Sequence, residues 1–429
     1  NFDAPMLNTS CVSSLFYADD LVMLSTSKHG LQNAINTLGL YCNKWKLSVN
    51  LTKTKILVFN KKGYMFSNLK FHLLNKDIEI VSSYCYLGVV FTTGCNFTTA
   101  IKTLQKKALR ALFSIKTTLG DSNPSISVYC KLFDACVVPI LTYGAEVWGN
   151  CKTGLNDKSP TEQIHLKFCK SILGVRKNAS NLATRAELGR YPLWIEVCIR
   201  LYSYYKRLVR EVPPNSLQFE SFLVQQDMHR RKLPCWLSSV SRILEESGFA
   251  YLLLNRDSNT SSAQSEVKQR LKDIYVQSFY SELNSSGKKE NQGNKLRTYK
   301  TFKHTYEREK YLDITNFNHR RAMTKLRISD HLLHIEAGRY NRTPPSDRLC
   351  IFCNENYIEN EVHFVLECSL YKDIRNSPVS DILLDRRYAH LTKEEMFAHV
   401  MSTANYDVMK KLCEFVYKCF KKREEACKS

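Results

Sequence analysis

The sequence predicts an α+β N-terminal unit, followed by a mostly α-helical region and a small zinc-knuckle module. Short apolar runs separated by turn residues fill residues 1–95, a pattern typical of β-hairpins. Apolar residues at helical spacing recur from residue 99 to about residue 210, and a polar, mostly helical stretch follows at residues 215–310. Cysteines and a histidine with metal-ligand spacing follow between residues 350 and 368.

Each expected element has its own local signal. Residues 12–17 and 21–25 have the composition of two strands joined at Ala18-Asp19-Asp20, and residues 31–45 predict an amphipathic helix. We expect further antiparallel strands at residues 55–59, 69–73, 78–81 and 84–91. Beyond them, with a break at Pro139, helices are expected at residues 100–115, 126–148, 164–173, 193–208, 315–336, 361–367 and 393–422.

The composition is that of a basic chain. Its 429 residues carry 62 Lys and Arg against 41 Asp and Glu, a formal net charge of +21. Such an excess attracts polyanions, so we expect nucleic acid as the partner and no membrane, because no long apolar run is present. Most of the 16 cysteines stand alone in apolar helical patterns as expected core residues, which favours a reducing intracellular compartment, nuclear or cytoplasmic. Since the chain begins with Asn1, we expect it to be part of a longer protein.

Two adjacent carboxylates, Asp19 and Asp20, stand at the first predicted hairpin turn, within the sequence FYADD. Like charges directed at one point repel each other unless a cation compensates them. Two-metal phosphoryl transfer uses such carboxylates on a rigid element to hold divalent ions. An ordinary hairpin turn is the alternative interpretation, because Asp tolerates turn geometry.

The FYADD sequence resembles motif C of the palm in reverse transcriptases of non-LTR (LINE-type) retrotransposons. The resemblance continues in order: WKLSVNLTKTK (45–55) resembles motif D, YLGV (86–89) resembles motif E, and ILGV (172–175) and ELGRYP (187–192) resemble the thumb region. It implies a partial palm (1–95), a helical thumb (96–212), a helical linker (213–312), a basic helix with a CCHC zinc knuckle (313–375) and a C-terminal helical segment (376–429).

The resemblance implies catalytic roles for three residues. Asp19 and Asp20 would hold Mg²⁺ or Mn²⁺, and Lys53 would protonate the leaving pyrophosphate, a task that suits an ammonium group. A solvated charge is the alternative for Lys53, and Lys55 lies close enough in sequence to be the motif D lysine instead.

The resemblance also implies contacts to the primer. Tyr17 and Ala18 would lie under the primer terminus or the nascent base pair. Tyr86, Leu87 and Gly88 would form the primer grip, a turn whose glycine allows close backbone approach. A buried strand is the alternative for these three residues.

The family's motif A aspartate, motif B and fingers precede motif C, whereas eighteen residues precede Asp19 here and their one carboxylate, Asp3, fits no motif. The resemblance implies that the intact protein copies an RNA template onto a DNA target or primer from dNTPs, without another small-molecule cofactor. Because this chain lacks a third carboxylate and a nucleotide-binding surface, the isolated chain is expected to be inactive. The alternative is a non-catalytic, zinc-containing nucleic-acid-binding protein derived from a retroelement.

Cys350, Cys353, His363 and Cys368 have the spacing C-x₂-C-x₉-H-x₄-C. Three thiolates and one imidazole complete a closed tetrahedral Zn²⁺ site, so a structural role is predicted, and the cluster resembles the C-terminal CCHC module of LINE-type proteins. Unrelated reduced cysteines are the alternative.

Basic side chains interleave with aromatic ones around this cluster, a mixture suited to phosphate contacts and base stacking. A solvated helix face is the alternative. We also expect Arg339, Arg342 and Arg348 to offset the negative charge of the zinc site. The candidate nucleic-acid-binding residues are Arg320, Arg321, Lys325, Arg327, Arg339 and Arg342.

Overall fold

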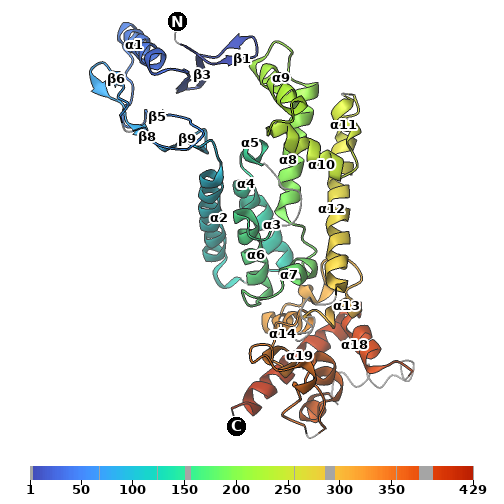
Figure 1. Cartoon of the computed structure of the whole chain (residues 1–429). Coiled ribbons are helices and arrows are strands. Elements are labelled where there is room, and N and C mark those ends of the chain that lie inside the picture. Colours follow the sequence, from blue (N-terminus) through green and yellow to red (C-terminus); the bar gives the residue numbers. More distant parts are fainter. Residues whose placement is uncertain are drawn as a thin grey trace. The chain divides into compact units, whose positions relative to one another are not determined.

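The computed structural model (Figure 1) describes residues 3–66, 68–122, 124–149, 156–255, 257–285, 295–353, 355–375 and 390–428. The chain forms two compact units, each assembled from segments that are distant in sequence. Unit 1 comprises Asn1–Arg110, Pro139–Gly154 and Trp194–Arg270, and unit 2 comprises Ala111–Val138, Leu155–Leu193 and Leu271–Ser429. Small sheets precede a long series of helices, which confirms the predicted mixed, mostly helical composition.

All described strands lie in unit 1 and pair two by two. The β3–β4 hairpin confirms the strands expected at residues 12–17 and 21–25, whereas the strand expected at residues 84–91 is divided into β9 and β10, because Leu87 and Gly88 have positive φ and form a turn. Antiparallel pairing, the arrangement expected for the strands, is found in β1–β2, β3–β4, β6–β7 and β9–β10. The expectation is wrong for β5 and β8, which are parallel, because the segment between them, which contains β6 and β7, acts as a crossover. The strands are β1 (Met6–Leu7), β2 (Ser10–Cys11), β3 (Ser14–Tyr17), β4 (Asp20–Met23), β5 (Ile56–Leu57), β6 (His72–Leu73), β7 (Lys76–Asp77), β8 (Ile80–Val81), β9 (Ser83–Tyr86) and β10 (Val89–Thr92).

Helix α1 (Lys28–Trp45) supports these strands and confirms the helix expected at residues 31–45. It begins at Ser27, whose hydroxyl accepts the Gly30 N–H, and ends at Lys46 in the left-handed conformation. Its buried face joins a small apolar core with β5, β6 and residues 71–78. The buried members of that core are Ile35, Ile56, Phe71, Leu73 and Ile78.

Helices account for most of the remaining described chain. Pro139 lacks the N–H that a continuous helix needs, and the helix expected at residues 126–148 is divided there as predicted. The helices are α2 (Thr98–Leu119), α3 (Ile126–Cys136), α4 (Val138–Leu141), α5 (Ala145–Trp148), α6 (Pro160–Leu173), α7 (Asn181–Glu187), α8 (Leu193–Arg210), α9 (Leu217–Arg230), α10 (Trp236–Glu246), α11 (Tyr251–Leu254), α12 (Ser261–Asn284), α13 (Tyr299–Phe302), α14 (Phe317–Arg327), α15 (His334–Ala337), α16 (Lys372–Arg375), α18 (Lys393–Met401) and α19 (Tyr406–Ala426). Single turns add the 3-10 segments Gly120–Ser122, Lys310–Asp313, Pro345–Asp347 and Ser369–Tyr371.

Two long helices expected near the C-terminus are each divided. The basic helix expected at residues 315–336 ends at Arg327, and Ser329 then adopts a φ of +55°, which a continuing right-handed helix excludes. The helix expected at residues 393–422 is broken between α18 and α19, because the Asn405 side chain accepts backbone N–H groups and begins a new helix.

A buried ion pair joins α7 to α14 in unit 2. The Arg327 guanidinium contacts both carboxylate oxygens of Glu187 at 2.9 and 3.2 Å, and both side chains are fully buried. The hydroxyls of Tyr299 and Tyr311 donate to the same carboxylate, at 2.9 and 2.6 Å. The arginine holds the pKa of Glu187 below its usual range although burial opposes this, so the pair is charged and fully hydrogen-bonded.

The described cysteines are all free thiols. Cys42, Cys169, Cys198 and Cys413 are buried, as expected for core residues, whereas Cys136 is exposed. No helix in the described ranges has the length and apolar character needed to span a membrane.

Candidate metal centre and nucleic-acid interface

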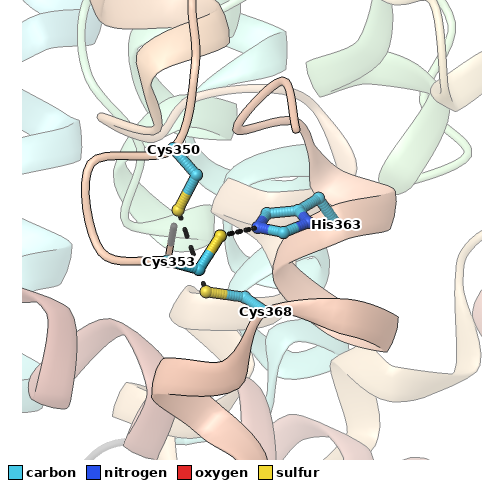
Figure 2. Close-up of side chains that lie close together, drawn as sticks. All are labelled: Cys350, Cys353, His363 and Cys368. Carbon is cyan, nitrogen blue, oxygen red and sulfur yellow. Dashed lines mark hydrogen bonds between the residues drawn. The ribbon is translucent and has the colours of Figure 1, made fainter. Parts of the chain in front are cut away.

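The first two cysteines of the cluster lie on a short antiparallel knuckle. Leu349 and Ile358 form an isolated β-bridge, and the Cys350 N–H donates to the Tyr357 carbonyl at 2.8 Å. The turn between these segments directs Cys350 and Cys353 to the same side (Figure 2).

The other two ligands lie at the start and directly after the end of a π-helical turn, His363–Glu367, where a short helix was expected at residues 361–367. His363 and Cys368 are five positions apart, which places them about 140° apart around a regular α-helix. The Cys368 N–H instead donates to the His363 carbonyl at 2.9 Å, a wide i→i+5 turn. This wider turn allows both side chains to reach the cysteines of the knuckle (Figure 2).

The four donors fit a tetrahedral zinc ion. Cys350 Sγ lies 3.8 Å from Cys368 Sγ, and Cys353 Sγ lies 3.4 Å from His363 Nε2. Zn–S bonds of about 2.3 Å and Zn–N bonds of about 2.0 Å at tetrahedral angles require S···S and S···N separations of about 3.8 and about 3.5 Å. All four donor atoms lie within 4.8 Å of one another, and all four residues are buried. Among the described residues, no other group of three or more His, Cys, Asp or Glu donors meets this criterion.

The ligands strongly perturb one another's protonation. The hydrogen bond with Cys368, together with burial, raises the pKa of the Cys350 thiol to about 12, and the same hydrogen bond lowers the pKa of Cys368. Burial opposes protonation of His363, but Cys350 and Glu367 raise its pKa overall. A divalent cation would bind the cysteines as thiolates and the histidine as neutral imidazole, so these side chains would no longer share protons with one another.

Residues outside the predicted ligand set support the centre. His363 Nδ1 lies 3.3 Å from a carboxylate oxygen of Glu367, and Glu367 forms an ion pair with Lys393 of α18. The Arg375 guanidinium donates to the Val365 and Cys368 carbonyls at 2.9 and 3.0 Å, which closes the end of the π turn. The sequence analysis missed these residues, although a Glu four positions after a ligand His was a usable signal.

Two of the three arginines expected to offset the charge of the zinc site have other partners. Arg348 is buried and donates to the Thr343 and Ile335 carbonyls, which hold its guanidinium in place. Arg339 pairs with Glu336 at 2.9 Å, and Arg342 is exposed.

The acidic pair lies at the tip of the β3–β4 hairpin. Tyr17 pairs with Asp20, so Ala18 and Asp19 form a two-residue turn, and Ala18 has a φ of +48°. Asp19 and Asp20 are exposed, and neither contacts a cationic side chain in the part of the chain that the structure describes. Tyr17 is also exposed (64%). The hairpin expected from the sequence is confirmed.

The two candidate motif D lysines have different surroundings. Lys55 forms an ion pair with Glu79. Lys53 is exposed and has no ion-pair partner among the described residues, while its backbone carbonyl accepts the Tyr84 hydroxyl at 2.9 Å.

The turn expected at residues 86–88 is the tip of the β9–β10 hairpin. Leu87 and Gly88 both have positive φ, +47° and +80°. The Tyr143 hydroxyl donates to the Leu87 carbonyl at 2.9 Å, and a Cβ added at Gly88 would lie 2.9 Å from the Tyr143 ring. The glycine is therefore required by the turn and by the packing of Tyr143.

The candidate basic residues of α14 separate into two groups. Arg327 is 1% exposed and paired with Glu187, and Arg320 is buried and donates to the Ile314 carbonyl at 2.7 Å. The structure thus contradicts an exposed basic face at these two positions. Arg321 is exposed and Lys325 is partly exposed, so these side chains are accessible to a ligand.

A basic, mostly helical chain with a Cys₃His centre and an acidic hairpin is typical of proteins that handle nucleic acid. No family model matches the chain. It is 26% identical over 140 residues to a probable RNA-directed DNA polymerase from transposon BS of Drosophila melanogaster, covering 31% of this chain and 16% of that protein. It is 28% identical over 146 residues to a putative uncharacterized transposon-derived protein of Caenorhabditis elegans, covering 33% of this chain and 50% of that protein. The matched stretches span half or less of these relatives, and they support a retroelement origin for this chain.

Proposed function

We propose that this chain is the C-terminal part of an RNA-directed DNA polymerase of a non-LTR retrotransposon, in which the β3–β4 hairpin carries two metal-binding carboxylates. The observation that carries the proposal is the exposed tip with Asp19 and Asp20 after a two-residue turn, on a chain related to transposon proteins. Two carboxylates fixed on a rigid hairpin suit Mg²⁺ or Mn²⁺. The bound ions would activate the primer hydroxyl and stabilise the leaving pyrophosphate.

The surrounding residues would act on the same reaction. Lys53 is the better general acid of the two lysines, because its ammonium group is not committed to a carboxylate. Tyr17 and Ala18 would support the primer terminus. The turn formed by Tyr86, Leu87 and Gly88 would guide the primer backbone. The partners of the intact protein would be an RNA template and a DNA target or primer.

Two-metal catalysis needs a further carboxylate, and Asp3 does not supply it. The Ser27 hydroxyl donates to the Asp3 carboxylate, and the Thr26 N–H donates to the Asp3 carbonyl at 2.8 Å, so Asp3 fastens the segment before β1 to the loop after β4. The 429-residue chain alone is therefore expected not to polymerise.

Primer extension tests the catalytic proposal. The chain as it stands should not extend a DNA primer on an RNA template with Mg²⁺ or Mn²⁺, yet should bind Mn²⁺ measurably by electron paramagnetic resonance. The variant Asp19→Asn/Asp20→Asn should lose that binding, and Lys28→Ala is a matched surface control. Mn²⁺ binding that survives the double substitution would contradict the hairpin site, and robust extension by the isolated chain would contradict its expected inactivity.

We also propose that the Cys₃His cluster holds a closed, structural Zn²⁺, since four protein donors leave no open position for a substrate. Elemental analysis of the purified, reduced chain should find about one zinc per chain. Cys353→Ser should lose it, and the exposed Cys136→Ser should retain it. Zinc-free protein with an unchanged melting temperature would contradict a structural role.

The second candidate function is a non-catalytic nucleic-acid-binding protein, favoured by the Cys₃His donor set and by the accessible side chains of Arg321 and Lys325 in the same unit. The DNA sequence upstream of the codon for Asn1 distinguishes the two candidate functions. An open frame encoding a motif A aspartate supports the polymerase, and an in-frame stop supports the binding protein.

A further inference from the structure

We propose that unit 2 binds single-stranded nucleic acid on a surface formed by the loop after α6, the exposed side of α14 and the turn after α15. The members of this surface, the loop–α14 surface, are Arg176, Lys177, Arg321, Lys325 and Tyr340. The inference deepens the proposed nucleic-acid function by assigning its substrate class and adding Arg176 and Lys177 to the expected residues.

The loop and α14 are held together at Gly174. This residue ends α6 with a φ of +68°, and its carbonyl accepts the Arg321 Nε–H at 2.8 Å. A Cβ added there would lie 2.9 Å from Arg321 Cγ and 3.0 Å from the Phe317 ring. The glycine thus permits the stem of Arg321 to lie against the loop. Its guanidinium remains exposed, with no other partner among the described residues.

The loop itself is fixed by Asp330. The Arg176 N–H and Nε–H donate to the two carboxylate oxygens of Asp330, both at 2.8 Å. The Asp330 side chain is fully buried, whereas that of Arg176 is 36% exposed. Lys177 follows Arg176 directly and is exposed. The single carboxylate in this contact is enclosed and fixes both the backbone and the side chain of Arg176, directly before Lys177.

Positive charge accumulates around Lys325. Partial burial, followed by the charges of Arg321 and Arg176, lowers the pKa of this lysine although Asp330 and Glu424 oppose the shift. Lys325 has no ion-pair partner in the described chain. Phosphate groups would compensate the positive charges of Lys325 and Arg321.

An aromatic side chain stands beside these cations. Tyr340 is 65% exposed, and its hydroxyl accepts the Asn178 side-chain N–H at 3.4 Å, which brings the ring beside the loop. Exposed aromatic rings among cations stack on bases, and this requires bases that are unpaired. Single-stranded RNA or DNA therefore fits the surface better than a duplex, which offers phosphates alone.

The test is fluorescence anisotropy on the full chain with a labelled, unstructured RNA of about 16 nucleotides, within the range of single-strand binding sites, and a duplex of equal length. Lys177→Ala/Lys325→Ala should lower the salt slope for the single strand by about 1.4, or roughly twenty-fold in affinity near 0.1 M salt. Lys300→Ala/Lys310→Ala removes the same charge from exposed lysines elsewhere in unit 2 and should have a clearly smaller effect.

Tyr340 separates the two substrate classes. Tyr340→Ala should weaken single-strand binding roughly five- to hundredfold and leave duplex binding nearly unchanged, while Tyr340→Phe should retain affinity. If the chain binds the RNA and neither the lysine variant nor Tyr340→Ala differs from its control, the loop–α14 surface is refuted and the proposed function stands. Equal losses on duplex and single strand would refute the assignment to single strands. A chain that binds neither probe would overturn the nucleic-acid function itself.

Discussion

The carboxylate of Glu367 is expected to tune the zinc affinity of the centre through His363. Its oxygen lies 3.3 Å from His363 Nδ1, so with zinc on Nε2 it would accept the Nδ1–H and fix the tautomer of the ring. Removing such an outer partner typically lowers metal affinity ten- to hundredfold, about 1.4 to 2.7 kcal/mol. The contact is long and the carboxylate also serves Lys393, so we expect the lower end, about tenfold, for Glu367→Ala.

Competition with a chromogenic chelator under reducing conditions measures this change directly. Glu367→Gln retains an acceptor without the charge and should fall between the wild type and Glu367→Ala. Glu394→Ala removes an exposed carboxylate next to Lys393 and is the matched control. Because zinc binds the folded state, the melting temperature at limiting free zinc should fall in the same order. Equal zinc affinity for Glu367→Ala and the wild type would refute the role assigned to Glu367.

Three further outcomes are expected. Arg327→Ala leaves the Glu187 carboxylate buried without its guanidinium partner, with only the tyrosine hydroxyls donating to it, and should lower the free energy of unfolding by about 3 to 5 kcal/mol in urea titrations; a loss below about 1 kcal/mol would contradict the buried pair. Burial raises the pKa of the Cys413 thiol from its usual value near 9 to about 12, so its contribution to stability is complete below pH 9 and is lost as the pH rises towards 12. Cys413→Ala, unlike the exposed Cys136→Ala, should therefore flatten the fall in unfolding free energy between pH 9 and 10.5, to which this thiol contributes about 1.6 kcal/mol. Gly174→Ala should cost about 1 kcal/mol or more in thermal unfolding, because the residue has a positive φ and the new Cβ meets Arg321; unchanged stability would contradict that packing.

The sequence correctly predicted those elements that depend on interactions between residues close together in the chain. The hairpin around Asp19 and the helix ending at Trp45 follow from turn residues and apolar spacing, and the zinc ligands follow from the chemistry of thiols and imidazole. The division of the helix expected at residues 315–336 did not follow, because a left-handed residue such as Ser329 gives no signal in helical periodicity. The division of the helix expected at residues 393–422 depends on the side chain of Asn405, which caps a new helix.

The amino-acid sequence by itself determined which side chains could bind metal or phosphate, since charge, donor atoms and short-range spacing are properties of the chain. Tertiary structure alone decided which of those side chains are accessible. Arg327 and Arg321 lie on the same basic helix, yet Arg327 is enclosed against Glu187 from α7 and Arg321 lies exposed beside Gly174. Burial depends on partners that are more than a hundred residues distant, and no local pattern encodes them.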